Sequence, residues 1–279
     1  MRIATWQWGG RLQAGTVSAD GHEVTPLDVP STVELIERLV RGEALPREAG
    51  PRLPTEAVTL AAPIPMPRRN LFCVGRNYRA HAAELATTVF REQLPEKDAW
   101  PIVFTKVPET VVGPHDTVRL PDPDITPQID YEAELALVIG KRGRNIKRAR
   151  AMDHVFGYTI LNDVTARDVQ VRHQQWVLGK SFDTFCPMGP WIVTADELDG
   201  TNTRVRCWVN GELRQDGVTE NLIFDIPTLI ETVSRGITLY PGDVIATGTP
   251  AGVSPLRPGD VVEVEIPGAG ILRNPVQAP

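Results

Sequence analysis

Three acidic residues open an otherwise apolar segment, "QIDYEAELALVIG", at residues 128–140. The segment reads as a β-strand, in which successive side chains point to opposite faces of the sheet. Asp130, Glu132 and Glu134 therefore share one face. The other face carries four residues without charge, Tyr131, Ala133, Leu135 and Leu137. Because a buried carboxylate is costly unless it is paired or bound to a metal, the fold must either leave this face in water or bring cations to it.

Two interpretations of this strand remain open at this point. One is the solvent-facing side of an antiparallel strand, a common pattern. The other is a site for a hard cation, because Mg²⁺, Mn²⁺ and Ca²⁺ prefer oxygen ligands and two acids on one strand face lie roughly 7 Å apart. A metal there needs a further oxygen ligand. Asp163 in "LNDVTARD", where a strand is expected to end and a helix to begin, offers one.

Other residues carry weaker signals. His81 and Glu84 in "HAAE" are neighbours on one helical face, where a carboxylate can orient an imidazole as a general base, although an exposed polar face has the same pattern. Lys180 lies among small and apolar residues in "LGKSFDTF" and is either a solvated charge or a buried one. The Gly- and Thr-rich stretch 246–254, "ATGTPAGVS", can present backbone N–H groups to an anion or form a tight turn.

Composition excludes several classes of protein. The net charge of -6 and a pI of about 5.5 argue against a nucleic-acid partner. The sequence has no apolar run long enough to cross a membrane and no pattern typical of a secretory signal. The three cysteines are an odd, widely spaced set, which favours reduced thiols over disulfides or a zinc site. We therefore expect a cytoplasmic protein without a membrane partner.

The chain is expected to form two units. Residues 1–65 predict a small α+β domain, with short strands and a helix that starts after Ser31, where Glu34 completes a capping box. A proline-rich connector, "AAPIPMPRRN", then leads into residues 66–279. This second unit is rich in short strands joined by Asn-Gly, Pro-Gly-Asp and Gly-rich turns. The sequence thus predicts a mixed α/β fold dominated by β-structure.

Five blocks, taken together, resemble the fumarylacetoacetate hydrolase family. They are "GRNYRAHAAEL", "DYEAELALVIGKRGRNI", "GYTILNDVTARDVQ", "GKSFDTFCPMGPWIV" and "LYPGDVIATGTPAGV", and the similarity extends over about residues 70–276. The resemblance implies a rolled mixed β-sheet with a barrel-like core, and it identifies residues 1–65 with the small extra domain of many bacterial members. It also implies a homodimer.

The resemblance implies a role for each candidate residue. Glu132, Glu134 and Asp163 correspond to the ligands of one Mg²⁺ or Mn²⁺ per subunit, whereas Asp130 lies outside the motif, as outer support or surface. His81, Glu84 and Lys180 correspond to catalytic residues, the first two activating a water and the lysine stabilising an oxyanion. The implied substrate contacts are Arg76, Asn77, Tyr78, Arg167, Gln170 and Thr249.

The implied reaction is metal-dependent hydrolysis of a C–C bond in a small acylpyruvate-like acid. The alternatives within the family are an isomerase or decarboxylase of a 2-oxo or 2-hydroxy-dienedioic acid in aromatic-acid breakdown. A non-catalytic protein that binds a small carboxylic acid is the alternative of another class. The segment from His81 to about Trp100 corresponds to a lid, expected to be poorly ordered without ligand. Two departures, Ser254 after "GTPAGV" and "FTKVPET" at residues 104–110, alter the pocket wall and leave the substrate open.

Overall fold

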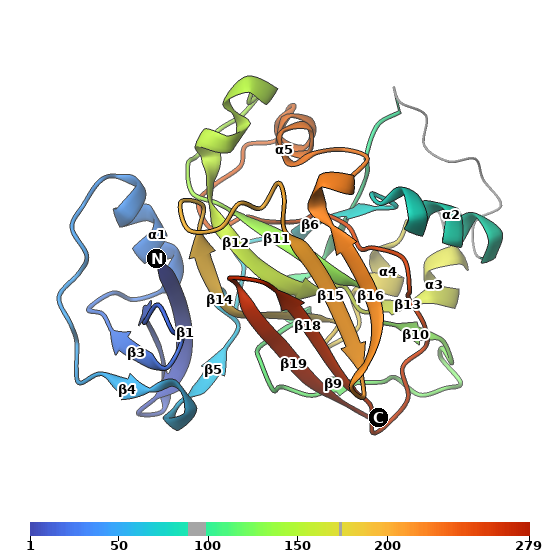
Figure 1. The fold of residues 1–279 in the computed structure, drawn as a ribbon, viewed down its shortest axis with the longest axis horizontal. Helices are drawn as coiled ribbons and strands as arrows, with labels where there is room; N and C mark the ends of the chain where they lie inside the picture. The colour runs from blue at the N-terminus through green and yellow to red at the C-terminus, as the bar shows by residue number, and fades with distance from the viewer. Residues whose placement is uncertain (89–98, 173–174) are drawn as a thin grey trace.

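The computed structural model describes residues 1–88, 99–172 and 175–279. Over these residues the chain forms two large β-sheets and one short two-stranded ladder, with small helices at their edges (Figure 1). Both parallel and antiparallel strand pairs occur in the two large sheets. The mixed, β-dominated fold predicted from the sequence is therefore confirmed.

The larger sheet has twelve strands, ten of them in the order β4-β3-β2-β1-β14-β12-β11-β17-β6-β7, with β5 beside β1 and β8 beside β14. The strands β4 and β7 end this order, so within the described residues the sheet stays open rather than closing into a barrel. Its strands are β1 (Arg2–Trp8), β2 (Arg11–Val17), β3 (Glu23–Pro26), β4 (Leu53–Pro54), β5 (Thr59–Ala61), β6 (Leu71–Gly75), β7 (Ile102–Lys106), β8 (Val111–Val112), β11 (Ala133–Ile139), β12 (Val155–Asn162), β14 (Cys186–Thr194) and β17 (Val244–Ala246).

The smaller sheet has five strands in the order β16-β15-β18-β19-β9. They are β9 (Val118–Arg119), β15 (Arg204–Val209), β16 (Glu212–Val218), β18 (Val261–Ile266) and β19 (Gly270–Gln277); β10 (Ile129–Asp130) and β13 (Thr165–Ala166) form the separate ladder. Apolar residues of β11, β15 and β18 share one core, including Leu135, Val205 and Val262. This core holds the smaller sheet against one face of β11.

The N-terminal strands continue the larger sheet. Arg2 and Ile3 of β1 pair with Val193 and Ile192 of β14, although residues 9–185 separate the two strands along the chain. The helix α1 (Thr32–Val40) begins as predicted, with the Ser31 hydroxyl accepting a hydrogen bond from the backbone of Glu34. The division of the chain near residue 65 stays a prediction, because strands on both sides of it belong to one sheet.

The helices are short. Those of α type are α1, α2 (Arg79–Thr88), α3 (Arg167–Arg172), α4 (Val177–Lys180) and α5 (Ile226–Ser234), and single 3₁₀ segments are η1 (Thr55–Ala57), η2 (Pro108–Thr110), η3 (Arg148–His154) and η4 (Thr219–Asn221). None of the described helices is long and apolar enough to span a bilayer. The predicted lid, from His81 to about Trp100, overlaps residues 89–98, which lie outside the described residues.

Candidate metal and catalytic site

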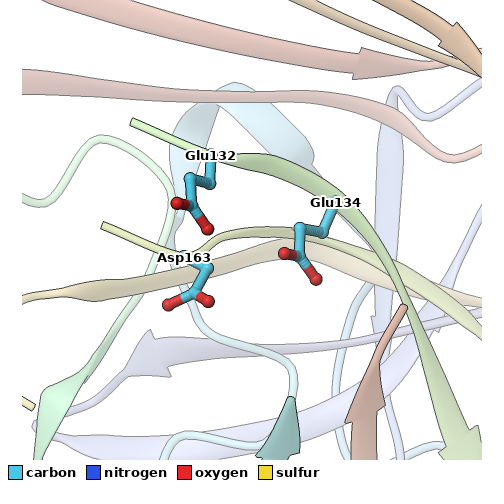
Figure 2. A group of neighbouring side chains, drawn as sticks. All are labelled: Glu132, Glu134 and Asp163. Atoms are coloured by element: carbon cyan, nitrogen blue, oxygen red, sulfur yellow. The ribbon is translucent and has the colours of Figure 1, made fainter. Parts of the chain in front are cut away.

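The acids of the opening segment are buried beside a third carboxylate. Glu132 precedes β11, Glu134 lies on it, and Asp163 follows the neighbouring strand β12, with which β11 pairs in antiparallel register. One carboxylate oxygen from each residue lies within 4.8 Å of the others, and all three side chains are buried (Figure 2). The interpretation of this face as a solvent-exposed strand edge is wrong, because the side chains of all three acids are buried.

The alternation along β11 explains how acids and core coexist. Tyr131, Ala133 and Leu135 belong to the large apolar core shared with the smaller sheet. On the face that carries Glu132 and Glu134, the next residues along, Ala136 and Val138, enter a second apolar core. The acids therefore lie at the end of a buried strand, on the face away from the smaller sheet's core.

Two buried lysines hold Asp163 and Glu132. The Lys180 ammonium donates to Glu132 Oε2 at 2.8 Å and to Asp163 Oδ2 at 2.7 Å. Lys106, on β7, donates to Asp163 Oδ1 at 2.7 Å and to the carbonyl of Val164 at 3.0 Å. Lys180 is thus a buried charge rather than a solvated one. Lys106 is a partner that the sequence did not reveal, because β7 reaches Asp163 only in the folded sheet.

A buried arginine supports the same acids from the other side. Arg167, at the start of α3, donates from Nε to Asp130 Oδ2 at 2.9 Å and from a terminal nitrogen to Glu132 Oε1 at 2.6 Å. Its other terminal nitrogen donates to Gln170 Oε1 at 2.8 Å. Asp130 therefore reaches the cluster only through Arg167, in the outer supporting position that was one of its two expected places.

The pKa values of Glu132 and Glu134 are shifted in opposite directions by their surroundings. Burial alone would raise the pKa of Glu132, but the charges of Lys180 and Arg167 outweigh it and hold that pKa well below its ordinary value. Burial raises the pKa of Glu134 well above its ordinary value, and the negative charges of Asp163 and Glu132 raise it further. Glu134 accepts a hydrogen bond from the backbone of Gly248 at 2.8 Å, and within the described residues it forms no salt bridge. Its carboxylate is therefore the one that most needs a further cation.

This set of donors fits a hard divalent metal ion. The three carboxylates supply oxygen atoms only, from three directions and within a small volume, as Mg²⁺ and Mn²⁺ require. Glu132, Glu134 and Asp163 would hold such an ion, and substrate or water oxygens would complete its coordination. Bound there, the ion would supply positive charge to oxygens that become negative during a reaction.

The predicted pair of His81 and Glu84 is formed on α2. His81 Nδ1 lies 3.1 Å from Glu84 Oε2, and the His81 side chain is buried. The two Glu84 oxygens also accept from the backbone N–H of Gly252 at 3.2 and 3.3 Å. When Nδ1 donates its hydrogen to the carboxylate, Nε2 keeps its lone pair and can take a proton. The loop 248–252, which donates to Glu84 from Gly252, also donates to Glu134 from Gly248, so it connects the His81–Glu84 pair with the carboxylate cluster.

Three of the expected substrate contacts are occupied by protein groups. The Asn77 amide donates to the carbonyls of Phe224 and Thr247 and accepts from the backbone of Phe224. Gln170 is bound to Arg167, whose own donors face the acids. Asn77, Gln170 and Arg167 thus form hydrogen bonds within the protein, and their role as direct substrate contacts stays a prediction.

The other expected contacts differ among themselves. Thr249 donates to the carbonyl of Ala133 and accepts from Gln215, whereas Arg76 is buried with a positive φ of 55°. The Tyr78 hydroxyl is buried and has no hydrogen-bond partner within the described residues. Burial raises the pKa of Tyr78, and the charge of Glu134 adds to this effect. Tyr78 therefore keeps its proton and is the best placed of the six to donate a hydrogen bond to a ligand oxygen.

The fold and the site together define an enzyme-like centre, with buried oxygen ligands beside an oriented histidine. The family pattern described as "Fumarylacetoacetate (FAA) hydrolase C-terminal" matches residues 70–277. The chain therefore belongs to the fumarylacetoacetate hydrolase family, as the sequence blocks indicated, and members of this family commonly bind a divalent metal.

Individual relatives cover most of the chain. Oxaloacetate tautomerase YisK of Bacillus subtilis is 49% identical over 227 residues, which are 78% of this chain and 73% of the relative. The solved structure of a fumarylacetoacetate hydrolase from Exiguobacterium antarcticum has a TM-score of 0.86 at 43% identity and covers 100% of both chains. A 2-hydroxyhepta-2,4-diene-1,7-dioate isomerase from Mycobacterium marinum has a TM-score of 0.82 at 34% identity, covering 100% of this chain and 98% of that one.

Proposed function

We propose that the protein interconverts the enol and keto forms of oxaloacetate or a closely related short 2-oxo dicarboxylic acid. The observation that carries the proposal is the oriented His81, bound to Glu84 at 3.1 Å, in a pair that one loop connects to Glu134 of the buried acids. The name of the Bacillus relative supports this reaction, because that protein is an oxaloacetate tautomerase at 49% identity. This choice reverses the order of the sequence-based expectation, in which hydrolysis came first and isomerisation second.

The residues present match the proton transfer that this reaction needs. Tautomerisation moves one proton between C3 and the C2 oxygen and breaks no C–C bond, so an acid–base group and a place for an oxyanion are enough. In the keto-to-enol direction, His81 Nε2 would take a proton from C3 and deliver it to the C2 oxygen; in the enol-to-keto direction it would take the proton from that oxygen and deliver it to C3. Lys180, whose pKa stays raised because Asp163 and Glu132 outweigh its burial, would keep its positive charge beside the developing oxyanion.

The proposal includes one Mg²⁺ or Mn²⁺ per subunit, held by Glu132, Glu134 and Asp163. The buried oxygen cluster supports a hard divalent ion over a softer one. A homodimer and a place in the cytoplasm, both expected from the sequence, are part of the same proposal.

Hydrolysis of an acylpyruvate is the second candidate. It is favoured by the same oriented imidazole, because a base beside a buried cluster can also activate a water for attack on a carbonyl. The name of the Exiguobacterium structure, a fumarylacetoacetate hydrolase, supports it too. An isomerase of a dienedioic acid would also move a proton without breaking a C–C bond, but on a longer, conjugated substrate, whereas a decarboxylase would need no base at C3.

A direct assay separates these reactions. Protein stripped of metal would be given fresh oxaloacetate, and decay of the enol's ultraviolet absorbance would be followed with and without Mg²⁺ or Mn²⁺. We expect metal-dependent acceleration, and a loss of about 100-fold or more in His81→Ala, the size typical of a removed general base. His22→Ala, in an exposed turn, is the matched control and should behave as wild type.

Each other outcome selects another function. Metal-dependent release of pyruvate from acetylpyruvate or fumarylpyruvate, with no effect on the enol of oxaloacetate, would establish the hydrolase. Loss of CO₂ from oxaloacetate that survives in His81→Ala would establish a decarboxylase. Binding of Mn²⁺ without turnover of any of these acids would indicate the non-catalytic binding protein.

A further inference from the structure

The backbone between the two glutamates lacks a neighbouring strand on one side. The strand β17 pairs with β11 at Ala136, Leu137 and Val138, and Thr247 extends this contact to the carbonyl of Leu135. Beyond that point the chain leaves the sheet as the loop 248–252. The N–H and the carbonyl of Ala133, which lies between Glu132 and Glu134, must find their partners elsewhere because the residue is completely buried.

Two side chains take the place of the missing strand. Gln215, on β16 of the smaller sheet, accepts through Oε1 from the Ala133 N–H at 3.0 Å. The Thr249 hydroxyl donates to the Ala133 carbonyl at 2.9 Å. The Gln215 amide nitrogen then donates to Thr249 Oγ1 at 2.8 Å and to the carbonyl of Pro250 at 2.7 Å. The Gln215 side chain is completely buried and both ends of its amide are used.

The loop 248–252, which Gln215 holds, also contacts both the carboxylate cluster and the His81–Glu84 pair. Its Gly248 N–H donates to Glu134 Oε2 at 2.8 Å, and its Gly252 N–H donates to the Glu84 carboxylate. There is no spare room behind it, because a Cβ at Gly252 would lie 2.0 Å from the carbonyl oxygen of Arg214. A movement of the β16 strand would therefore be transmitted to the loop, to the acids and to the histidine's partner.

We propose that Gln215 is a positioning residue, which fixes the peptide groups of Ala133 and thereby the directions in which Glu132 and Glu134 point. In a strand the two side chains that flank a residue take their directions from its peptide planes. Gln215 thus controls how closely the carboxylates converge, and hence the affinity for a divalent ion. This inference rests on the metal binding that is part of the proposed function.

The chain offers a matched control. Gln13, on β2, is also a buried glutamine, and its amide donates to the carbonyls of Ala14 and Leu27 at 2.7 and 2.8 Å. It lies in the N-terminal part of the larger sheet and contacts none of the site residues. Replacing either glutamine by methionine keeps the length of the side chain and removes its hydrogen bonds.

The test measures Mn²⁺ binding by calorimetry in the full-length protein. We expect Gln215→Met to weaken binding by about 10–100-fold, as is common when a group supporting metal ligands is removed, and Gln13→Met to leave it unchanged. Turnover in Gln215→Met should recover at saturating Mn²⁺, unlike in His81→Ala. Thr249→Val should weaken binding in the same direction, and the double variant should lose less than the two effects combined, because both side chains hold Ala133.

The outcomes are distinct. A folded Gln215→Met variant that binds Mn²⁺ within about twofold of wild type, or equal weakening in Gln13→Met, overturns the positioning role alone. Wild-type protein that binds no Mn²⁺ overturns the proposed function together with this inference. If Gln215→Met does not fold, Thr249→Val, which removes the hydrogen bond to the Ala133 carbonyl, takes its place in the same comparison with Gln13→Met.

Discussion

The larger sheet contains two regions that differ in whether their buried side chains include charged groups. At the start of β11 seven buried side chains are charged, namely Asp130, Glu132, Glu134, Asp163, Lys106, Arg167 and Lys180, whereas the rest of this strand enters apolar cores. Around β1 the buried cluster holds apolar side chains, namely Ala4, Trp6, Val17 and Val24. The two regions are connected through the pairs β1–β14, β14–β12 and β12–β11, so they are parts of one hydrogen-bonded structure.

The difference shows which region stabilises the fold. Apolar burial contributes about 25 cal/mol per Å² with little dependence on the identity of each neighbour. Buried charges contribute little net stability, and each one depends on its partners remaining in place. We therefore infer that the apolar cores, around β1 and along the rest of β11, supply the stability of a sheet in which the charged cluster at the start of β11 is organised for binding and chemistry.

Removing Arg167 should give the largest effect. Arg167→Met leaves the carboxylates of Asp130 and Glu132 buried without their guanidinium, which should lower the free energy of unfolding by about 3–5 kcal/mol. Arg204→Met is the matched control, because Arg204 pairs with Asp216 at an exposed position and its loss should destabilise the fold far less. Urea unfolding of both variants checks this, and equal losses would show that burial does not distinguish the two pairs.

A cavity in the apolar region should affect stability without affecting the site. Trp6 is completely buried, and Trp6→Ala should lower the free energy of unfolding by about 3–5 kcal/mol. Mn²⁺ affinity of the folded variant should stay at the wild-type value, because none of the proposed ligands contacts this cluster. Calorimetry below the unfolding transition tests this, and a tenfold loss of affinity would mean that the two regions are coupled.

Replacing Glu134 should have the reverse effect of Trp6→Ala, because it should raise stability and abolish metal binding. Glu134 forms no salt bridge within the described residues, and burial raises the pKa of its carboxyl. Near neutral pH the folded, metal-free protein therefore bears the cost of keeping this acid either charged in the interior or protonated, and Glu134→Gln removes that cost. We expect the metal-free variant to be more stable than wild type by on the order of 1 kcal/mol, and to lose Mn²⁺ binding. A less stable variant in thermal unfolding would argue against this account of the carboxylate.

The smallest effect concerns the three thiols, which lie in the two larger apolar cores. Cys73, Cys186 and Cys207 are free and buried, and burial raises the pKa of Cys186 to about 12. At pH 8 the native thiols should react with a disulfide reagent about 100-fold more slowly than those of unfolded protein. Because a raised pKa keeps the thiol protonated, the rate should increase with pH through this range. Reaction of one thiol per native chain at the unfolded rate would contradict the structural role.

Local patterns in the sequence predicted the parts of the site that lie close together along the chain. The shared face of Glu132 and Glu134 follows from the period of a strand, and the His81–Glu84 pair follows from the period of a helix. The start of α1 at Ser31 was predicted in the same way. Asp163 could be proposed from an oxygen-ligand argument, but its choice among the other acids came from the family resemblance.

The supporting residues could not be predicted, because they come from distant segments. Lys106 reaches Asp163 across 57 positions of the chain, and Gln215 reaches Ala133 across 82. Nothing in "VNGELRQDG" distinguishes Gln215 from any other polar residue near a hairpin turn. A buried amide between two strands, in place of a backbone partner, becomes visible only when the loop 248–252 is seen to leave the sheet.

The pairing of β1 with β14 also has a consequence for biosynthesis. Ile3 pairs with Thr16 of β2 on one side and with Ile192 on the other, so one edge of this part of β1 has no partner until about 190 further residues have been made. At roughly 5–20 residues per second, a ribosome needs about 10–40 s for that length. During this interval the unpaired edge is open to contacts with other chains. The strand β1 therefore completes its pairing in the larger sheet long after it has been made, and β17 joins that sheet later still.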